Sequence, residues 1–243
     1  RLNTTAWDAM AREMLAAGVT EIAFPLPGAQ GLSLTGGAKA GGVAFGKKIE
    51  WTHCILPNAT WKVGDGDTHL KIFDQEKSSW AEGRAVFSSA FVKSFTAVRQ
   101  AVAAHLEAVN LTHVARTVTI KDEAYYVDPF TMDALLGLAR LIKRVTPHVR
   151  LRQTRFPTAQ YGKLNATAVA ELKELVDVWV VHHQQYDDKD ENVPKEVAAE
   201  QAKGKLTTLY DNSIPAIQLS AHRIRLFPWA LWLTNSGSWR GVP

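Results

Sequence analysis

Two adjacent carboxylates, Asp122 and Glu123, follow a short β-branched run at residues 117–120 of this 243-residue chain. Such a run predicts a β-strand, which would place both carboxylates at its carboxyl end, where the active sites of (β/α)8 barrels are built. Paired carboxylates there suit hydrolysis of a glycosidic bond, including the substrate-assisted form in which a 2-acetamido group of the sugar supplies the nucleophile. Two solvated acidic residues that open a loop are the alternative interpretation.

Strand-like and helix-like patterns alternate along the chain, and this alternation implies a parallel sheet. Strands are expected to start at Glu21, His69, Arg116, His148, Asp177 and Leu206. Helices are expected at residues 5–17, from Ser88 or Ser89 to about 109, at 131–145, 165–176 and 194–202, and from Ser220. In the first helix, the spacing predicts a buried face made of Trp7, Met10, Met14 and Ala17.

Six strands are two fewer than a closed barrel requires. We therefore expect a (β/α)8 TIM-type barrel that is incomplete at its first and last strands, one missing before residue 1 and one after Leu233. The alternative is an open, doubly wound parallel sheet. No Pro- or Ser-rich linker divides residues 1–243, so a single barrel domain is expected, with a long irregular insertion at about residues 26–68.

The composition argues against a membrane span and against a nucleic-acid partner. Apolar residues make up 46% and charged residues 21% of the chain, and the net charge of +4 comes from scattered Lys and Arg. No apolar stretch approaches the roughly 20 residues of a membrane span, and no basic stripe of the kind that binds nucleic acid is present. We therefore expect neither a membrane span nor a nucleic-acid partner. The single Cys54 excludes an internal disulfide and a multi-cysteine metal site.

Further polar and aromatic side chains are expected at the ends of strands. Tyr125 and Tyr126 follow the carboxylate pair, and Tyr210 and Asp211 end a later strand that should share a rim with Glu123. His182 ends another strand. The substrate-binding candidates are therefore Tyr125, Tyr126, Tyr210, Asp211 and His182.

Two other groups of residues have side chains that could bind a metal ion or a sugar. His182 and His183, with the acidic residues beyond them, match neither zinc nor EF-hand spacing, so no metal site is expected. Trp51, Trp61 and Trp80 offer ring faces that suit sugars, and core packing is the alternative for each.

Four N-x-Thr acceptor sequences begin at Asn3, Asn58, Asn110 and Asn165, whereas chance predicts about one in a chain with seven Asn and 29 Ser and Thr residues. This excess favours a secreted or lysosomal protein of eukaryotic origin, and a bacterial origin is the alternative. Because the chain starts at Arg1 without a signal peptide, we expect a mature or trimmed chain.

Several motifs occur in an informative order in the second half of the chain: the run into Lys121–Asp122–Glu123, then Tyr210–Asp211, then a segment at 217–232 that carries Arg223, Arg225, Phe227, Pro228, Trp229 and Trp232. In these motifs the chain resembles the catalytic domain of glycoside hydrolase family 123 and its uncharacterised relatives. The resemblance extends from about residue 5 to residue 239 and is stronger after residue 88. Ala124 replaces the proline that usually follows the glutamate in relatives, and residues 237–240 replace an apolar last strand.

The resemblance implies a retaining, substrate-assisted exo-β-N-acetylhexosaminidase that releases terminal β-N-acetylgalactosamine from a glycan or glycolipid, with no metal or organic cofactor. By this resemblance Glu123 is the general acid and Asp122 orients the acetamido group. Two alternatives stay open. One is a retaining glycosidase in which Asp211 is a direct nucleophile, and the other is a non-catalytic, carbohydrate-binding barrel fragment.

Overall fold

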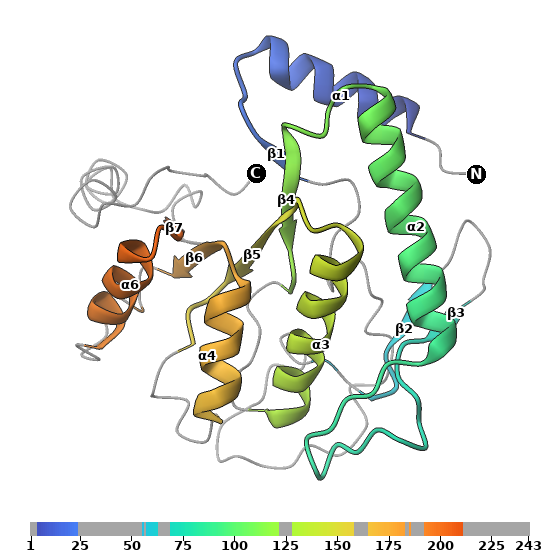
Figure 1. Ribbon diagram of the computed structural model, residues 1–243, viewed down its shortest axis with the longest axis vertical. Helices are drawn as coiled ribbons and strands as arrows, with labels where there is room; N and C mark the ends of the chain where they lie inside the picture. The colour runs from blue at the N-terminus through green and yellow to red at the C-terminus, as the bar shows by residue number, and fades with distance from the viewer. Residues whose placement is uncertain are drawn as a thin grey trace, which may run out of the picture. The chain divides into compact units, whose positions relative to one another are not determined.

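The computed structural model describes residues 4–23, 55, 57–62, 69–121, 128–157, 165–182, 185 and 192–210 (Figure 1). The chain folds as two compact units, Arg1–Leu151 and Arg152–Pro243. Helices alternate with parallel strands in both, so the fold is α/β, as the sequence pattern predicts. The expected organisation of residues 1–243 as one barrel domain stays a prediction.

The first unit contains two kinds of strand pairing. Its elements are α1 (Thr5–Ala16), β1 (Ile22–Ala23), β2 (Thr60–Lys62), β3 (His69–Lys71), α2 (Ser89–Ala108), β4 (Ala115–Thr119) and α3 (Pro129–Val145). Strand β1 pairs in parallel with β4, and Ile22 lies opposite Ala115. Strands β2 and β3 pair with each other in antiparallel orientation, and Trp61 lies opposite Leu70.

The β2–β3 pair corrects two expectations. The strand at His69, expected in the parallel sheet, is half of an antiparallel pair, and residues 60–62, expected to be irregular, form its partner. The physical reason is chain length. A parallel crossover needs a dozen or more residues, whereas only residues 63–68 connect these two strands. Most of the stretch predicted as an insertion lies outside the described residues.

Aromatic side chains fill the core of the first unit. Phe73, Phe91, Phe95 and Phe130 are almost fully buried. Trp61, at 7% exposure, meets the rings of Phe91 and Phe95 edge-on, with centroid distances of 5.6 and 5.8 Å. Trp61 is therefore a packing residue rather than a sugar platform, and Trp51 lies outside the described residues.

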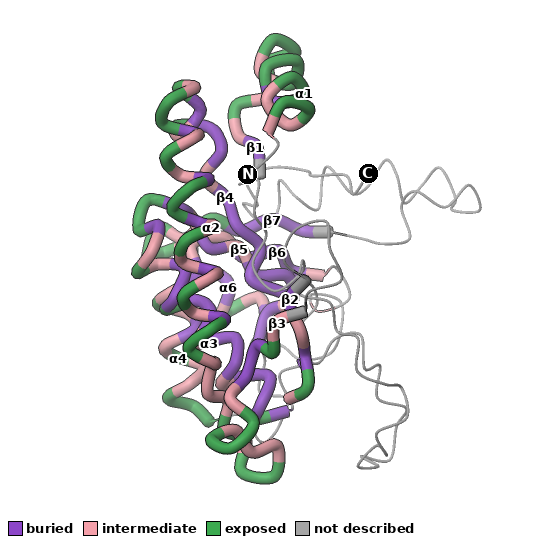
Figure 2. The backbone as a smooth tube through the Cα atoms, turned by 90° about the vertical axis from the view of Figure 1, so that its right-hand side faces the viewer, coloured by how far each residue is buried: buried purple, intermediate pink, exposed green. Residues whose placement is uncertain are grey.

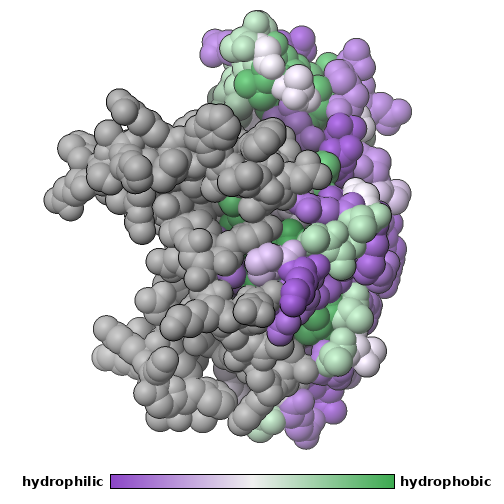
Figure 3. Space-filling view, turned by 90° about the vertical axis from the view of Figure 1, so that its left-hand side faces the viewer, coloured by the Kyte–Doolittle hydropathy of each residue, from purple (hydrophilic) through white to green (hydrophobic). Residues whose placement is uncertain are grey.

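Helix α1 turns a different face inward from the expected one. Met10 and Met14 are 47% and 36% exposed, whereas Ala11 is fully buried; α1 shows hydrophobic surface at the top of Figure 3. Asp8 Oδ1 lies 2.8 Å from His105 Nε2 on α2. This polar contact sets the rotation of α1, because a buried face centred on the two methionines would carry Asp8 away from His105.

The second unit repeats strand and helix in the expected order. Its elements are α4 (Ala166–Leu175), β6 (Val178–His182), α6 (Asn192–Ala202) and β7 (Leu206–Tyr210), with β5 (Arg150–Thr154) spanning the boundary between the units. Strand β6 pairs in parallel with both β5 and β7. Figure 2 shows that these strands are largely buried, whereas α4 and α6 carry exposed residues.

The described strands form no closed barrel, so closure into a (β/α)8 barrel stays a prediction, as does the doubly wound alternative. The helix expected from Ser220 and the apolar strand expected after Leu233 lie outside the described residues. Among the helices that the structure describes, none is long and apolar enough to cross a membrane.

Candidate functional site

The described chain on either side of the carboxylate pair is well packed. On one side, Thr117, Thr119 and Lys121 alternate with Val118 and Ile120, and all five residues are buried. Alternate residues face opposite sides of a strand, so both sides of the chain at the end of β4 are covered, as is typical of parallel strands. Asp122 follows Lys121 directly, and the pair therefore comes after the carboxyl end of a parallel strand, as expected.

Asp128 is the first described residue after the carboxylate pair. Its carboxylate accepts hydrogen bonds from the backbone N–H groups of Phe130 (3.1 Å) and Thr131 (3.2 Å) and thereby caps α3. The Thr131 hydroxyl donates to Asp128 and accepts from the backbone N–H of Ile55 at 2.9 Å. Residues 122–127 thus run from a buried strand end to a capped helix start. This cap also explains why α3 begins two residues before the predicted position.

The candidate residues within this connection, Asp122, Glu123, Tyr125 and Tyr126, lie outside the described residues, so their roles stay predictions. The structure fixes the two ends of the connection in the first unit. A connection between the carboxyl end of a parallel strand and the start of a helix is where α/β proteins place ligand-binding and catalytic groups.

The cap at Asp128 makes a stability prediction. Asp128→Ala removes the acceptor for the first N–H groups of α3 and should lower the free energy of unfolding by about 1–2 kcal/mol. Asp128→Asn keeps a side-chain oxygen and should lose clearly less. Urea denaturation of the three proteins measures both changes. Equal losses in the two variants would contradict the capping role.

The same carboxylate gives a pH prediction. Burial raises the pKa of Asp128, and the hydrogen bonds from Thr131 and Phe130 only partly oppose that rise. At pH values between the ordinary aspartate pKa of 3.8 and the raised pKa of the folded state, the folded protein binds more protons than the unfolded protein. The contribution of Asp128 to the free energy of unfolding therefore falls as the pH increases through that window. The stability of the wild type relative to Asp128→Asn should accordingly be greater at the acidic end of the window than at neutral pH.

In the second unit, the backbone register brings two of the substrate-binding candidates together. His182 and Tyr210 are the last residues of β6 and β7 and lie directly opposite each other. His182 is half-buried, and Asp211, which follows Tyr210, lies outside the described residues. The roles of His182, Tyr210 and Asp211 in substrate binding stay predictions.

Successive residues of β6 and β7 belong to opposite faces of this sheet. Trp179 on β6 packs edge-on against Phe156 at 4.9 Å, and Thr207 on β7 accepts a hydrogen bond from Gln201 on α6. Residues two apart share a face, so His182 belongs to the face opposite that of Trp179 and Thr207. Thr154 and Thr208, which are 9% and 4% exposed, belong to that same face. Val178, Val180 and Leu206 belong to this face as well, so it carries both polar and apolar side chains.

The sequence pattern did not predict the left-handed backbone of Arg155, which follows β5 with a φ of 68°. Its backbone N–H donates to the carbonyl of Val180 at 2.9 Å, and the Gln185 side chain bonds both the N–H (3.0 Å) and the carbonyl (2.8 Å) of Phe156. No local pattern announces this left-handed residue, because long-range hydrogen bonds impose it.

Among the described residues, no group of three or more His, Cys, Asp or Glu side chains could hold a metal ion. His183 and the acidic residues at 187–191 lie outside the described residues. The expected absence of a metal or organic cofactor therefore stays a prediction.

Comparisons with known proteins give one structural likeness. No protein family matches the chain, and no curated protein matches it. A family 123 glycoside hydrolase from Clostridium perfringens, studied for glycolipid glycan hydrolysis, superposes with a TM-score of 0.36 at 14% sequence identity. The match covers 51% of this chain and 19% of the enzyme's length. A TM-score at this level does not establish a shared family, so the membership suggested by the sequence motifs stays a prediction.

Proposed function

We propose that the protein is a glycoside hydrolase that removes terminal β-N-acetylhexosamine, in particular N-acetylgalactosamine, from a glycan or glycolipid by substrate-assisted catalysis with retention. The observation that supports this proposal most is the place of Asp122 and Glu123 in the chain. They follow the carboxyl end of a buried parallel strand and precede the capped start of α3. The motif resemblance in the second half of the chain supports the same assignment.

In the proposed mechanism, Glu123 donates a proton to the glycosidic oxygen as its bond to C1 breaks. Asp122 accepts a hydrogen bond from the acetamido N–H of the sugar, which orients the acetamido carbonyl oxygen to attack C1. The product of this step is an oxazolinium ion, whose N–H stays hydrogen-bonded to the Asp122 carboxylate. Water then attacks C1 and breaks the bond from C1 to the acetamido oxygen, while Glu123, now a carboxylate, takes a proton from the water. The 2-acetamido group is restored, and two inversions give overall retention.

Substrate binding is assigned to polar and aromatic residues near strand ends. Tyr125 and Tyr126 follow the proposed acid, His182 and Tyr210 are the last residues of β6 and β7, and Asp211 follows Tyr210 in the chain. Phenol and imidazole groups can donate and accept hydrogen bonds with sugar hydroxyls, and a tyrosine ring can stack on the apolar face of a sugar. The proposal requires no metal or organic cofactor.

Turnover of 4-nitrophenyl N-acetyl-β-galactosaminide, with the anomer of the first-formed product identified by proton NMR, tests the proposed function. We expect release of the β-anomer before mutarotation. Release of the α-anomer would contradict retention. Absence of turnover together with measurable sugar binding would instead favour the non-catalytic carbohydrate-binding alternative.

We further propose a secreted or lysosomal location, based on the acceptor sequences. Asn58, Asn110 and Asn165 are exposed, so expression in a eukaryotic secretory host should add glycan to at least one of them, as measured by mass spectrometry. Thr167→Ala is a matched control for Asn165, because it removes the acceptor sequence and keeps the asparagine that caps α4. Three bare asparagines would favour a bacterial origin.

A further inference from the structure

The loop at residues 74–87, here called the Trp80 loop, is docked on the first turns of α3. The backbone N–H of Ala85 donates to Asp133 Oδ2 at 2.8 Å. Gly83 lies so close to Pro129 that a Cβ on Gly83 would stand 2.4 Å from the Pro129 Cβ. The loop is therefore anchored to the helix that directly follows the connection bearing the proposed catalytic pair, and all of these residues belong to the first unit.

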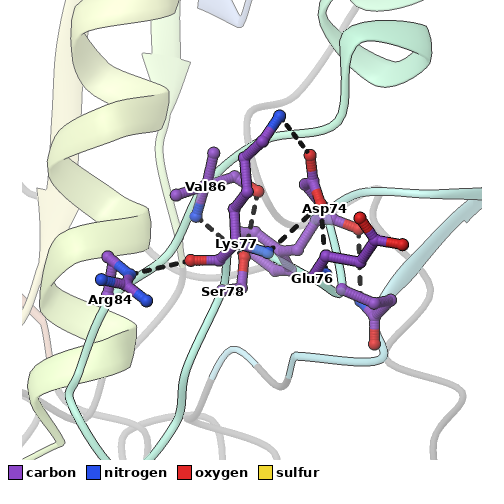
Figure 4. A network of polar contacts seen from close by, with 8 residues as sticks. Asp74, Glu76, Lys77, Ser78, Arg84 and Val86 are labelled. Carbon is purple, nitrogen blue, oxygen red and sulfur yellow. Dashed lines mark hydrogen bonds and ion pairs between the residues drawn. The ribbon is translucent and has the colours of Figure 1, made fainter.

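A network of polar contacts holds the Trp80 loop in one shape (Figure 4). Ser78 Oγ donates to the carbonyl of Val86 at 3.1 Å and accepts from the backbone N–H of Val86 at 3.0 Å. Arg84 Nε donates to the carbonyl of Lys77 at 2.8 Å, and the Lys77 ammonium lies 3.0 Å from Asp74. A loop that is already ordered loses little conformational entropy when a ligand binds.

Trp80 stands at the start of the tight turn in this loop, where the Gly83 N–H donates to the Trp80 carbonyl at 3.0 Å. Its ring centroid lies 5.3 Å from that of the fully buried Phe130, with the planes tilted by 32°. Trp80 itself is only half-buried. Trp80 thus contacts a ring of the core while the residue keeps partial exposure, an arrangement different from that of the fully buried Trp179.

Exposed polar groups lie at neighbouring positions of the same turn. Glu82 and Arg84 form an ion pair at 3.0 Å, and the side chains are 62% and 56% exposed. A pyranose ring has an apolar face of C–H groups, which suits the electron-rich face of an indole, and a rim of hydroxyls, which suits carboxylate and guanidinium partners. The turn combines both kinds of contact on a rigid support.

We propose that Trp80 is a carbohydrate-binding platform that stacks against a pyranose ring of a glycan chain. The proposal that Trp80 binds a sugar is argued from the geometry of the Trp80 loop alone. The further proposal that this sugar belongs to the part of the substrate beyond the terminal N-acetylhexosamine rests on the proposed function. In that assignment Trp80 contributes to recognition of the glycan rather than to bond cleavage.

The test compares Trp80→Leu with Trp80→Phe, because both replacements keep an apolar contact with Phe130 and only phenylalanine keeps an aromatic face. Isothermal titration calorimetry with a trisaccharide that ends in β-linked N-acetylgalactosamine is the binding measurement. We expect about tenfold weaker binding for Trp80→Leu and a much smaller loss for Trp80→Phe. Met10→Ala, an exposed apolar residue on α1, serves as the control and should bind the trisaccharide like the wild type.

Kinetics then separate this inference from the proposed function. In an active preparation, Trp80→Leu should lower kcat/KM for both substrates by different factors. The factor for the trisaccharide should be about ten times larger than the factor for the 4-nitrophenyl monosaccharide. In a preparation without turnover, the calorimetric comparison alone decides the platform. Equal affinity of the wild type and Trp80→Leu for the trisaccharide would overturn the inference. Equal losses in both variants that follow a drop in Tm would also overturn it, since they would show a purely structural role.

Discussion

Replacing Glu123 with glutamine should lower kcat/KM for a natural N-acetylgalactosaminide by about 10²–10⁴-fold, the range typical of general acid catalysis. The physical reason is that the amide cannot protonate the glycosidic oxygen. A sugar alkoxide is a poor leaving group without that proton, whereas 4-nitrophenolate departs readily without one. The loss measured with 4-nitrophenyl N-acetyl-β-galactosaminide should therefore be much smaller than the loss with the natural glycoside.

The comparison between the two substrates is the decisive measurement for Glu123, because a folding defect would lower both rates together. Asp128→Asn, six residues nearer to the start of α3 than Asp122, is a control for carboxylate removal at the end of the same connection. Thermal unfolding of both variants checks that the fold is retained. Equal losses on the natural and aryl substrates in a folded Glu123→Gln protein would remove Glu123 from the acid role.

The second large effect concerns Asp122. If its carboxylate orients the acetamido group, Asp122→Ala should lower kcat for N-acetyl substrates by about 10²–10³-fold, the size expected for removal of one preorganised polar contact to the reacting group. Asp122→Asn keeps the shape and a weaker acceptor, so its loss should be intermediate. A thiazoline that mimics the oxazolinium intermediate should inhibit the wild type more tightly than N-acetylgalactosamine does, because ligands that resemble the intermediate bind better than ground-state sugars.

The competing mechanism, with Asp211 as a direct nucleophile, predicts a different chemical result. A 2-fluoro sugar with a good leaving group would then form a covalent glycosyl ester on that carboxylate, and peptide mass spectrometry would locate it. Trapping such an adduct, or failing to see thiazoline inhibition in an active preparation, would overturn the substrate-assisted mechanism. A carboxyl separation of about 5–5.5 Å would accompany the direct mechanism.

Much of the local structure follows from patterns within short stretches of the chain. Strand β4 lies within one residue of the predicted start at Arg116. The helices expected from Ser88 or Ser89 and from residue 165 are confirmed, and Ser88 and Asn165 cap them. These features depend on β-branched residues in a row, or on a side chain that accepts a hydrogen bond from an N–H two or three residues later. Such interactions involve only residues that are close together in the chain, so they can be predicted from the sequence.

Part of the candidate site could likewise be predicted from the sequence, and part of it could not. The sequence pattern placed the carboxylate pair after a strand, and it placed His182 and Tyr210 at strand ends, as the structure confirms for the described backbone. The alignment of His182 opposite Tyr210 is a property of the paired strands, because register depends on how one strand slides against its neighbour. No single stretch of sequence contains that information.

The sequence by itself determined the α/β alternation, the capped starts of α2 and α4 and the position of Asp122 and Glu123 after β4, because periodicity and capping act over a few residues. Only the tertiary structure decided which face of α1 is buried, whether His69 pairs in parallel, and which tryptophan is core and which is half-exposed. Those outcomes depend on partners far along the chain, such as His105 for α1 and Phe130 for Trp80. Whether a residue is buried depends on residues far away in the sequence. A pattern of apolar residues indicates which residues could be buried, but it does not indicate which residues they pack against.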